Sequence, residues 1–388
     1  MSENQNTPGL RFEGFADPWK LIKLGELFQA LPFKPFLKEP EEYGKYEVIQ
    51  QGNKPIIGFA NGNPCTEYKD TVLFGDHTLS LYKPQKPFFV ATDGVRILKG
   101  KQNIDGYYLL SLLERHKPQS EGYKRYYNIL VNVECFTTYD VHEQEQIGSY
   151  LDNLNYFITL QQKKCERLQH LKQALLRKMF PKPGEQVPEL RFEGFTEPWK
   201  ERKLGELSDE FEYGLNVPAT AFDGNHKYLR ITDIDNETHR FDMSNLTSPL
   251  ADFEQCEQYR LREHDLLFAR TGASVGKTYL YRPSDGLTYY AGFLIRAHIH
   301  DDVSSNFVFQ STLTERYQQF VTVTSQRSGQ PGINAQEYSE FVIPVPSVSE
   351  QHAIGSFFSH MDSLITLYQR NYERLQHLKQ ALLQRMFV

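Results

Sequence analysis

The residues that come closest to a chemical motif surround two glycines in the second half of the chain. Arg270, Ser274 and Lys277 belong to the segment RTGASVGKT (270–278), which is close to the P-loop that binds nucleotide phosphates. A P-loop has four residues between its glycines and opens a helix, whereas this segment has three, and Lys277 leads into the strand-like run TYLYRP. We therefore predict no nucleotide site here, but a tight turn that presents the three side chains on one edge.

Patterns typical of catalysis are missing from the rest of the sequence. It has no G-x-S-x-G nucleophile elbow and no H-E-x-x-H metal helix. An adenine methyltransferase would carry an Asn/Asp-Pro-Pro-aromatic motif to hold a flipped base, and the nearest segment, NPCT (63–66), lacks the second proline and the aromatic residue. His298 and His300 are the closest histidine pair, and their alternate spacing is typical of a structural role on a strand. We predict a chain with no catalytic and no metal site.

Length and composition indicate a globular protein with several domains. The 388 residues have room for two or three domains, and 39% hydrophobic with 13% aromatic residues are enough for buried cores. No apolar stretch reaches the roughly 18 residues that span a membrane. The first residues, MSENQNTPGL, lack the apolar region of a signal peptide. No cysteine has CxxC or zinc-finger spacing, so we expect a cytoplasmic protein with reduced thiols at Cys65, Cys135, Cys165 and Cys256.

The charge balance counts against a simple nucleic-acid binder, because the formal net charge is −6. Residues 28–142 carry 14 Lys and Arg against 13 Asp and Glu, whereas residues 208–349 carry 11 against 19. Any contacts with phosphates must therefore come from local basic clusters or from a basic partner subunit.

Two segments of the chain occur twice. PGLRFEGFADPWKLIKLGEL (8–27) returns as PELRFEGFTEPWKERKLGEL (188–207), with 15 of 20 positions identical. Residues 143–180 match 350–387 at 22 of 38 positions, and the run 166–176 is identical to 373–383. The segments between the repeats, 28–142 and 208–349, hardly resemble each other. A duplicated frame around two different inserts predicts a molecule that does one job twice, on two unlike targets.

The longer repeat is predicted to form a helix of about 38 residues, roughly 57 Å long. Its start is marked by Asp140-x-x-Glu143 in the first copy and Ser347-x-x-Glu350 in the second, both typical of a capping box. Apolar residues recur at alternating steps of three and four, the spacing of a helix seam; in the first copy these are Leu151, Leu154, Ile158, Cys165, Leu168, Leu175 and Met179. We predict that the two copies pack antiparallel and carry the inserts at opposite ends. The alternative is that each helix packs only on its own globular domain.

Both inserts are predicted to be mixed and rich in strands, with turns between short apolar runs. In the second insert we predict a helix at Ser311–Ser325 and strands at 228–234, 265–270, 278–281, 293–298 and 341–345. In the first insert we predict strands at 46–50, 56–59, 78–82, 88–90 and 128–133. The predicted fold class is α+β, with two globular mixed α/β domains (1–142 and 181–349), two long antiparallel coiled-coil-like helices (143–180 and 350–388) and a pseudo-two-fold internal repeat.

Four sequence features together resemble the specificity (S) subunit of type I restriction–modification enzymes. They are LREHDLLFARTGASVGKT (261–278), SGQPGINAQEYSEFVIPVPS (328–347), the E-Q-x-x-I-G helix starts (143–148 and 350–355) and ERLQHLKQALLxxMF at both helix ends. The resemblance covers nearly the whole chain, although the first insert has no counterpart of the TGAxxGK and GIN motifs.

The resemblance implies a non-catalytic, DNA-binding subunit. Each insert would be a target recognition domain that reads one half of a split, asymmetric sequence in double-stranded DNA, and the helices would fix the gap between the halves. Two methyltransferase (M) subunits, which bind S-adenosylmethionine, would dock on the repeated helices. Restriction/motor (R) subunits would add cleavage that depends on ATP and Mg²⁺. This chain would itself hold no cofactor and contact no membrane.

Side chains that reach base edges are usually arginine, asparagine and glutamine. In the second insert the predicted DNA-binding residues lie in the glycine turn and the SGQPGIN loop: Arg270, Ser274, Lys277, Arg327, Gln330 and Asn334. Lys277 and Arg327 are equally suited to hold phosphates. In the first insert the predicted residues, for which a solvated surface is an equal alternative, are Lys101, Gln102, Lys124 and Arg125.

Two other functions stay open at this point. The chain could be a coiled-coil scaffold, or an S-like regulatory protein, whose inserts bind protein partners; the acidic second insert favours this. It could also be an enzyme with divergent motifs. A bipartite methylated-adenine motif that depends on this gene would distinguish DNA recognition from both.

Overall fold

A computed structural model describes residues 6–101, 103–209, 211–327 and 329–388. The chain divides into two compact units, one formed by the described residues up to Gln162 together with Arg370–Val388, the other by Lys163–Gln369. The two long helices, α4 (Val141–Met179) and α8 (Val348–Met386), therefore contribute residues to both units. No helix among the described residues is long and apolar enough to cross a membrane.

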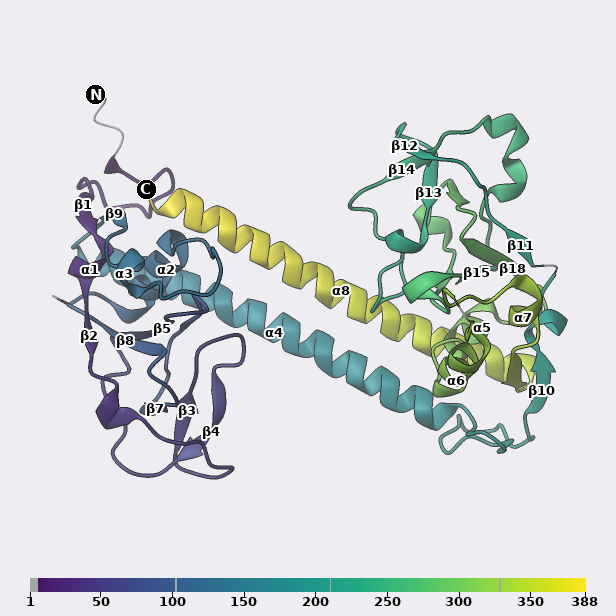
Figure 1. Ribbon diagram of the computed structural model, residues 1–388, viewed down its shortest axis with the longest axis horizontal. Coiled ribbons are helices and arrows are strands. Elements are labelled where there is room, and N and C mark those ends of the chain that lie inside the picture. The colour runs from purple at the N-terminus through teal and green to yellow at the C-terminus, as the bar shows by residue number, and fades with distance from the viewer. Residues whose placement is uncertain (1–5, 102, 210, 328) are drawn as a thin grey trace. The chain divides into compact units, whose positions relative to one another are not determined.

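The described residues of the first unit form three small sheets (Figure 1). A four-stranded antiparallel sheet has the order β2 (Phe28–Leu31), β8 (Val95–Gly100), β5 (Thr71–Gly75), β6 (Leu81–Tyr82). A three-stranded sheet has the order β4 (Ile56–Ala60), β3 (Tyr46–Ile49), β7 (Phe88–Val90), in which β3 and β7 are parallel. The remaining elements are the antiparallel pair β1 (Lys20–Lys23) and β9 (Glu134–Thr137) and the helices α1 (Leu24–Leu27), α2 (Gly106–His116) and α3 (Tyr127–Leu130).

In the second unit the residues that the structure describes form four sheets. The largest has the order β11 (Glu212–Tyr213), β18 (Leu294–His298), β15 (Asp265–Ala269), β16 (Thr278–Leu280). The two-stranded sheets are the parallel pair β13 (Lys227–Leu229) and β17 (Thr288–Tyr290) and the antiparallel pairs β10 (Lys200–Lys203) with β19 (Val342–Val345) and β12 (Ala219–Ala221) with β14 (Thr247–Pro249). Its shorter helices are α5 (Ser305–Ser311), α6 (Glu315–Thr324) and α7 (Ala335–Ser339).

The two inserts share a strand arrangement that their sequences do not reveal. In both four-stranded sheets the third strand pairs antiparallel with the second and the fourth, and five consecutive residues of that strand are buried. Among its described residues each unit also has one parallel pair, and an antiparallel pair between a strand of the short repeat and the last strand of the insert. The predicted α+β class is confirmed, and the duplication extends from the repeats into the inserts.

The short repeat and the start of each long helix form the same contact twice. The Arg11 guanidinium donates to the Glu143 carboxylate at 2.6 and 2.9 Å, and Arg191 donates to Glu350 at 2.7 Å with both nitrogens. Both carboxylates are fully buried. The predicted capping box is therefore only half correct, because Glu143 and Glu350 pair with arginines instead of accepting from the backbone N–H of the cap residue.

The cap side chains themselves behave as predicted. Asp140 accepts from the backbone N–H of Glu143 at 3.1 Å, and the Ser347 hydroxyl accepts from that of Glu350 at 3.4 Å. These bonds satisfy an otherwise unpaired N–H in the first turn of each helix.

The end of each long helix enters a globular core. In the second unit Phe180 stacks on Phe307 at 5.4 Å and packs edge-on against Trp199. In the first unit Phe387 packs against Trp19 and Tyr108. The two helices also contact each other: in the second unit Lys172 pairs with Asp362 and Cys165 lies against Ile365, so the segments run antiparallel there (Figure 1). Packing on a domain and packing between helices therefore occur together.

Some predicted elements are wrong or shorter than predicted. Asn128–Val133 is not a strand; Tyr127–Leu130 forms α3, because the Asp76 carboxylate accepts from the Tyr127 N–H. The helix predicted at Ser311–Ser325 is confirmed as α6 but begins later, at Glu315, because Thr314 caps it; the preceding helix α5, which ends at Ser311, was not predicted. The strand predicted from Tyr228 ends at Leu229, where Arg230 and Asp233 close a short 3₁₀ turn.

Candidate nucleic-acid interface

The glycine turn connects β15 to β16 in the second unit. Gly272–Ser274 form a 3₁₀ turn, and the Gly276 N–H donates to the Ala269 carbonyl at 3.0 Å. Lys277 then enters β16, and its carbonyl accepts from the Ala269 N–H at 2.8 Å. The prediction that this segment leads into a strand and forms no P-loop helix is confirmed.

The glycine turn and the SGQPGIN loop are hydrogen-bonded to each other. The Ile333 N–H donates to the Arg270 carbonyl at 2.9 Å, and the Gly272 N–H donates to the Pro331 carbonyl at 3.0 Å. The Gln330 amide nitrogen lies so close to Gly272 that a Cβ added there would be 3.0 Å away from it. Side chains from two distant segments of the sequence therefore share one surface, which we call the paired-loop surface (270–277, 327 and 329–334).

Tyr338 fixes the base of the paired-loop surface. Its buried hydroxyl donates to the Ala269 carbonyl at 2.7 Å and accepts from the Gly276 N–H at 3.1 Å. Gly276 has φ +84°, and a Cβ added there would lie 2.6 Å from the Val321 methyl groups on α6. The turn is thus hydrogen-bonded to the Tyr338 hydroxyl and packs closely against α6.

Arg270 lies between two exposed aromatic rings. Its guanidinium is 5.0 Å from the centre of the Tyr213 ring and 5.7 Å from that of Phe293. The two rings are 42% and 57% exposed. Within the described parts of the chain Arg270 forms no ion pair, so its charge is held mainly by ring faces. This arrangement orients the guanidinium and leaves its charge uncompensated by a carboxylate.

Two of the predicted residues also shape the loop. Asn334 caps α7, because its side-chain oxygen accepts from the Glu337 N–H at 2.9 Å. The Glu337 carboxylate accepts from the Asn334 N–H and pairs with Arg327, which also donates to the Thr324 carbonyl. Gln330 is exposed. The side chains of Gln330 and Arg270 are therefore less involved in holding the loop together than those of Asn334 and Arg327.

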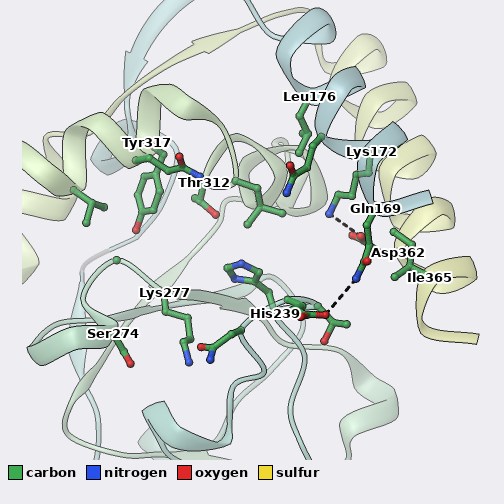
Figure 2. Close-up of a pocket in the computed structure, with 18 of the residues that line it drawn as sticks. Gln169, Lys172, Leu176, His239, Ser274, Lys277, Thr312, Tyr317, Asp362 and Ile365 are labelled. Atoms are coloured by element: carbon green, nitrogen blue, oxygen red, sulfur yellow. Dashed lines mark hydrogen bonds and ion pairs between the residues drawn. The ribbon is translucent and has the colours of Figure 1, made fainter. Parts of the chain in front are cut away.

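Lys277 and Ser274 also line a cavity of about 760 Å³ within the second unit (Figure 2). Lys277 donates to the Ile234 carbonyl at 2.9 Å, and burial lowers its pKa. Across the cavity Lys172 of α4 pairs with Asp362 at 2.6 Å; burial lowers the pKa of this lysine, although Asp362 opposes the shift. His239 bonds to the Thr278 carbonyl. These polar groups therefore bond to each other or to the backbone.

The structure separates the residues predicted in the first insert. Lys101 follows β8 and donates to the Gly25 carbonyl at 3.3 Å. Arg125 pairs with Asp93 at 3.0 Å and lies 3.7 Å from Asp76, near the other end of β8. Lys124 neighbours Arg125 and pairs with an adjacent carboxylate, that of Glu121, whereas Gln102 lies outside the described residues. Lys124 and Arg125 therefore share a surface that Lys101 does not reach.

None of these features forms a metal centre. Among the described residues, no group of three or more His, Cys, Asp or Glu side chains is placed to hold a metal ion. His298 bonds to Asp265 at 2.8 Å, which is the structural role predicted for it.

A profile of one protein family matches most of the chain. The family is the type I restriction modification DNA specificity domain, and the match covers residues 16–170 and 196–377, one copy in each half. The chain belongs to this family. It is a DNA-recognition subunit of a type I restriction–modification system, and the family is non-catalytic and acts in a complex with other subunits.

A solved S subunit of a type I system shares the fold of this specificity subunit. The crystal structure of the type I restriction-modification system S subunit from M. genitalium is 16% identical, with a TM-score of 0.65 over 98% of this chain and 99% of that one. A structure on complex assembly and conformational transition of the type I R-M system (17% identity, TM-score 0.45, 95% and 97% covered) and the HsdS subunit from Thermoanaerobacter tengcongensis (17%, 0.40, 97% and 98%) also match. No curated protein matches the chain.

Three residues that contact the paired-loop surface were not predicted from the sequence. Tyr213 and Phe293 flank Arg270 but lie far from it in sequence, so no local motif marks them. Tyr338 stands in the quoted motif SGQPGINAQEYSEF, where a tyrosine four residues after Asn334 was the available signal.

Proposed function

We propose that the two inserts read the two halves of a bipartite, asymmetric target in double-stranded DNA. The proposed recognition domains are residues 1–142 and 181–349, joined to the helices 143–180 and 350–388. The observation that carries this proposal is the paired-loop surface: two loops joined by backbone hydrogen bonds at the end of a rigid sheet. The first insert supports it, because it presents different loops on the same strand order.

Base reading in the second domain is assigned to Arg270 and Gln330. A guanidinium matches the two acceptors of guanine and an amide matches the donor and acceptor of adenine in the major groove, where each such pair discriminates by about 1–3 kcal/mol. Ser274 and Asn334 would add shorter contacts at the same edge. Lys277 and Arg327, and Lys101, Lys124 and Arg125 in the first domain, would bind phosphates and set the register.

The repeated helices are proposed to set the spacer and to dock two methyltransferase (M) subunits. Equivalent positions of the two copies expose large apolar side chains: Leu171 and Leu378 are 49% and 45% exposed, and Phe157 and Leu364 are 51% and 45% exposed. Exposed apolar side chains at matching positions favour a protein partner that binds twice.

The chemistry is proposed to belong to the partners. Methyltransferase subunits would bring S-adenosylmethionine, restriction/motor (R) subunits would bring ATP and Mg²⁺, and the complex would work in the cytoplasm. Because this chain has a net charge of −6, partner subunits would supply much of the grip on phosphates. The isolated chain is then expected to bind DNA weakly.

Methylome sequencing of host cells with and without this gene tests the proposal. We expect a bipartite methylated-adenine motif that disappears when the gene is deleted. An unchanged methylome would contradict the proposal and favour a scaffold or regulatory protein whose inserts bind protein partners.

A further inference from the structure

The turn after β5 in the first unit is the counterpart of the glycine turn in the second. The Gly75 N–H donates to the Ser80 carbonyl at 2.8 Å, as the Ala269 N–H donates to Lys277. The Leu79 N–H donates back to Gly75, as the Gly276 N–H donates to Ala269. Leu79 also has a positive φ, +57° against +84° for Gly276. The hydrogen bonds therefore align two turns of different length that share no sequence motif.

Asp76 occupies the backbone position of Arg270. The Asp76 N–H donates to the Gly94 carbonyl at 2.8 Å, and the Arg270 N–H donates to Phe293 at 3.1 Å. The Asp76 carbonyl accepts from Tyr126 at 2.8 Å, as the Arg270 carbonyl accepts from Ile333. The loop that ends at Tyr126 is thus the counterpart of the SGQPGIN loop, which was not recognisable in the first insert.

This alignment places Tyr123 at the position of Gln330, three residues before the shared hydrogen bond in each loop. Tyr123 is 88% exposed and stacks on His77, with ring centres 4.7 Å apart and planes inclined by 6°. His77 directly follows Asp76. The stack therefore joins the two loops of the first unit, as Gln330 and Gly272 are joined in the second.

Within the described part of the chain the imidazole of His77 is hydrogen-bonded through Nδ1, and its Nε2 has no hydrogen-bond partner. Its Nδ1 lies 3.1 Å from the Lys124 carbonyl, which can only accept, so Nδ1 carries the hydrogen. In the neutral ring Nε2 is then an acceptor. In the major groove such an acceptor matches the amino group of adenine or cytosine. The ring of Tyr123 packs on one face of the imidazole and restricts its orientation.

The charged residues nearby are less suited to reading. Asp76 is buried, accepts from the Tyr127 N–H and pairs with Arg96 at 2.8 Å. Arg125 is held by the carboxylate of Asp93. In the second unit Arg270 is held by rings, whereas here the nearby arginines are held by carboxylates.

We infer that His77 and Tyr123 are the specificity-determining residues of the first recognition domain and contact a base pair through an adenine or cytosine amino group. This inference rests on the proposed function, because it assigns the reading edge within one of the two proposed readers. The proposed base-contacting edge therefore lies away from Lys101 and beside Lys124 and Arg125.

The test uses full-length variants expressed with the host's partner subunits, read by methylome sequencing. His77→Ala and Tyr123→Ala are each expected to lower discrimination by about ten-fold or more at one position of one half-site, as loss of a base contact does. The other half-site and the spacer are expected to stay unchanged. Tyr43→Ala is the matched control: Tyr43 is 77% exposed in the same unit but precedes β3, at the opposite end from Gln51, which contacts His77. It is expected to leave the motif unchanged.

The outcomes separate this inference from the proposed function. If the His77 and Tyr123 variants keep the full motif while Arg270→Ala alters one half-site, the inference is overturned and the proposed function stands. If deleting the gene itself leaves the methylome unchanged, the proposed function fails. Should His77→Ala abolish methylation altogether, His77→Gln and Tyr123→Phe replace the alanine variants; an altered half-site supports the inference, and an unaltered one overturns it.

Discussion

The turns after β5 and β15 leave equivalent strands and hold their backbones with equivalent hydrogen bonds, yet they present opposite chemistry. The turn after β5 carries a buried aspartate followed by a histidine, on which a tyrosine of another loop stacks, whereas the turn after β15 begins with an arginine that lies between two exposed rings of other segments. The strands that support them are buried over all five residues. Burial thus constrains the residues of β5 and β15, whereas the exposed turns that follow them can differ in sequence. Two domains that recognise unlike half-sites require this combination.

The repeated frame shows the converse, with the same residue given different partners. Lys172 and Lys379 stand at matching positions of the identical helical run. Lys172 pairs with Asp362 on α8, whereas Lys379 pairs with Glu114 on α2. These partners explain how a lysine can interrupt each helix seam without leaving an unpaired charge.

The largest expected effect concerns the duplicated arginine–glutamate pair. Arg191→Ala leaves the Glu350 carboxylate buried and unpaired, which is expected to lower the free energy of unfolding by about 3–5 kcal/mol. Arg11→Ala is expected to cost less, because the Trp19 indole also contacts Glu143 at 3.3 Å whereas the buried Trp199 Nε1 has no partner in the part of the chain described. Chemical denaturation of both variants measures the difference. Equal losses would contradict this account of the two copies.

A loss of stability that extends over a lower range, about 2–5 kcal/mol, is expected from Gly276→Ala. A left-handed alanine costs about 1–2 kcal/mol, and crowding against Val321 adds about 1–3 kcal/mol. Gly329→Ala is the control, since Gly329 has no neighbouring atom within 4 Å of an added Cβ. Thermal unfolding compares the two. A neutral Gly276→Ala would show that α6 does not hold the turn.

Arg270→Ala is expected to change recognition more than stability. Loss of the guanidinium should relax one position of one half-site by about 1–3 kcal/mol of discrimination. Lys277→Ala serves as the comparison, because the loss of a phosphate contact weakens binding to all sequences alike. Competition binding to the assembled complex with single-base variants of the target measures both. If Arg270→Ala instead weakened binding to all single-base variants equally, Arg270 would be assigned to a contact with the DNA phosphates.

The smallest expected change is in the spacer. Removing one turn from each long helix shortens it by about 5.4 Å, the rise of one to two base pairs. The methylated motif should keep both half-sites and lose one or two spacer positions. Altered half-sites with an unchanged spacer would contradict the role proposed for the helices.

Patterns that depend on neighbours in sequence were predictable. The duplication, the long helices, the strand at Phe88–Val90 and the turn at Gly272 follow from local periodicity and turn residues. The strand Thr71–Gly75 was missed because it is buried on both faces and shows no alternation. The predicted strand at Asn128–Val133 was wrong because a distant carboxylate, that of Asp76, caps a helix there.

The recognition surfaces depend on contacts that no local pattern encodes. Tyr123 and His77 lie far apart in sequence, as do Arg270 and Tyr213, and only the sheet brings each pair together. Lys101 was chosen for its charge, and the strand register then separates it from Arg125. Position relative to the shared backbone hydrogen bonds, and not residue type, locates the first reading edge.

One exchange tests most directly whether each unit reads its own half-site. Residues 28–142 are replaced by the corresponding insert of a relative with a different target, and the methylome is sequenced in cells that carry the partner subunits. We expect one half of the methylated motif to change to that of the relative, while the other half and the spacer stay as they were. A change in both halves, or in neither, would contradict the division into two independent readers.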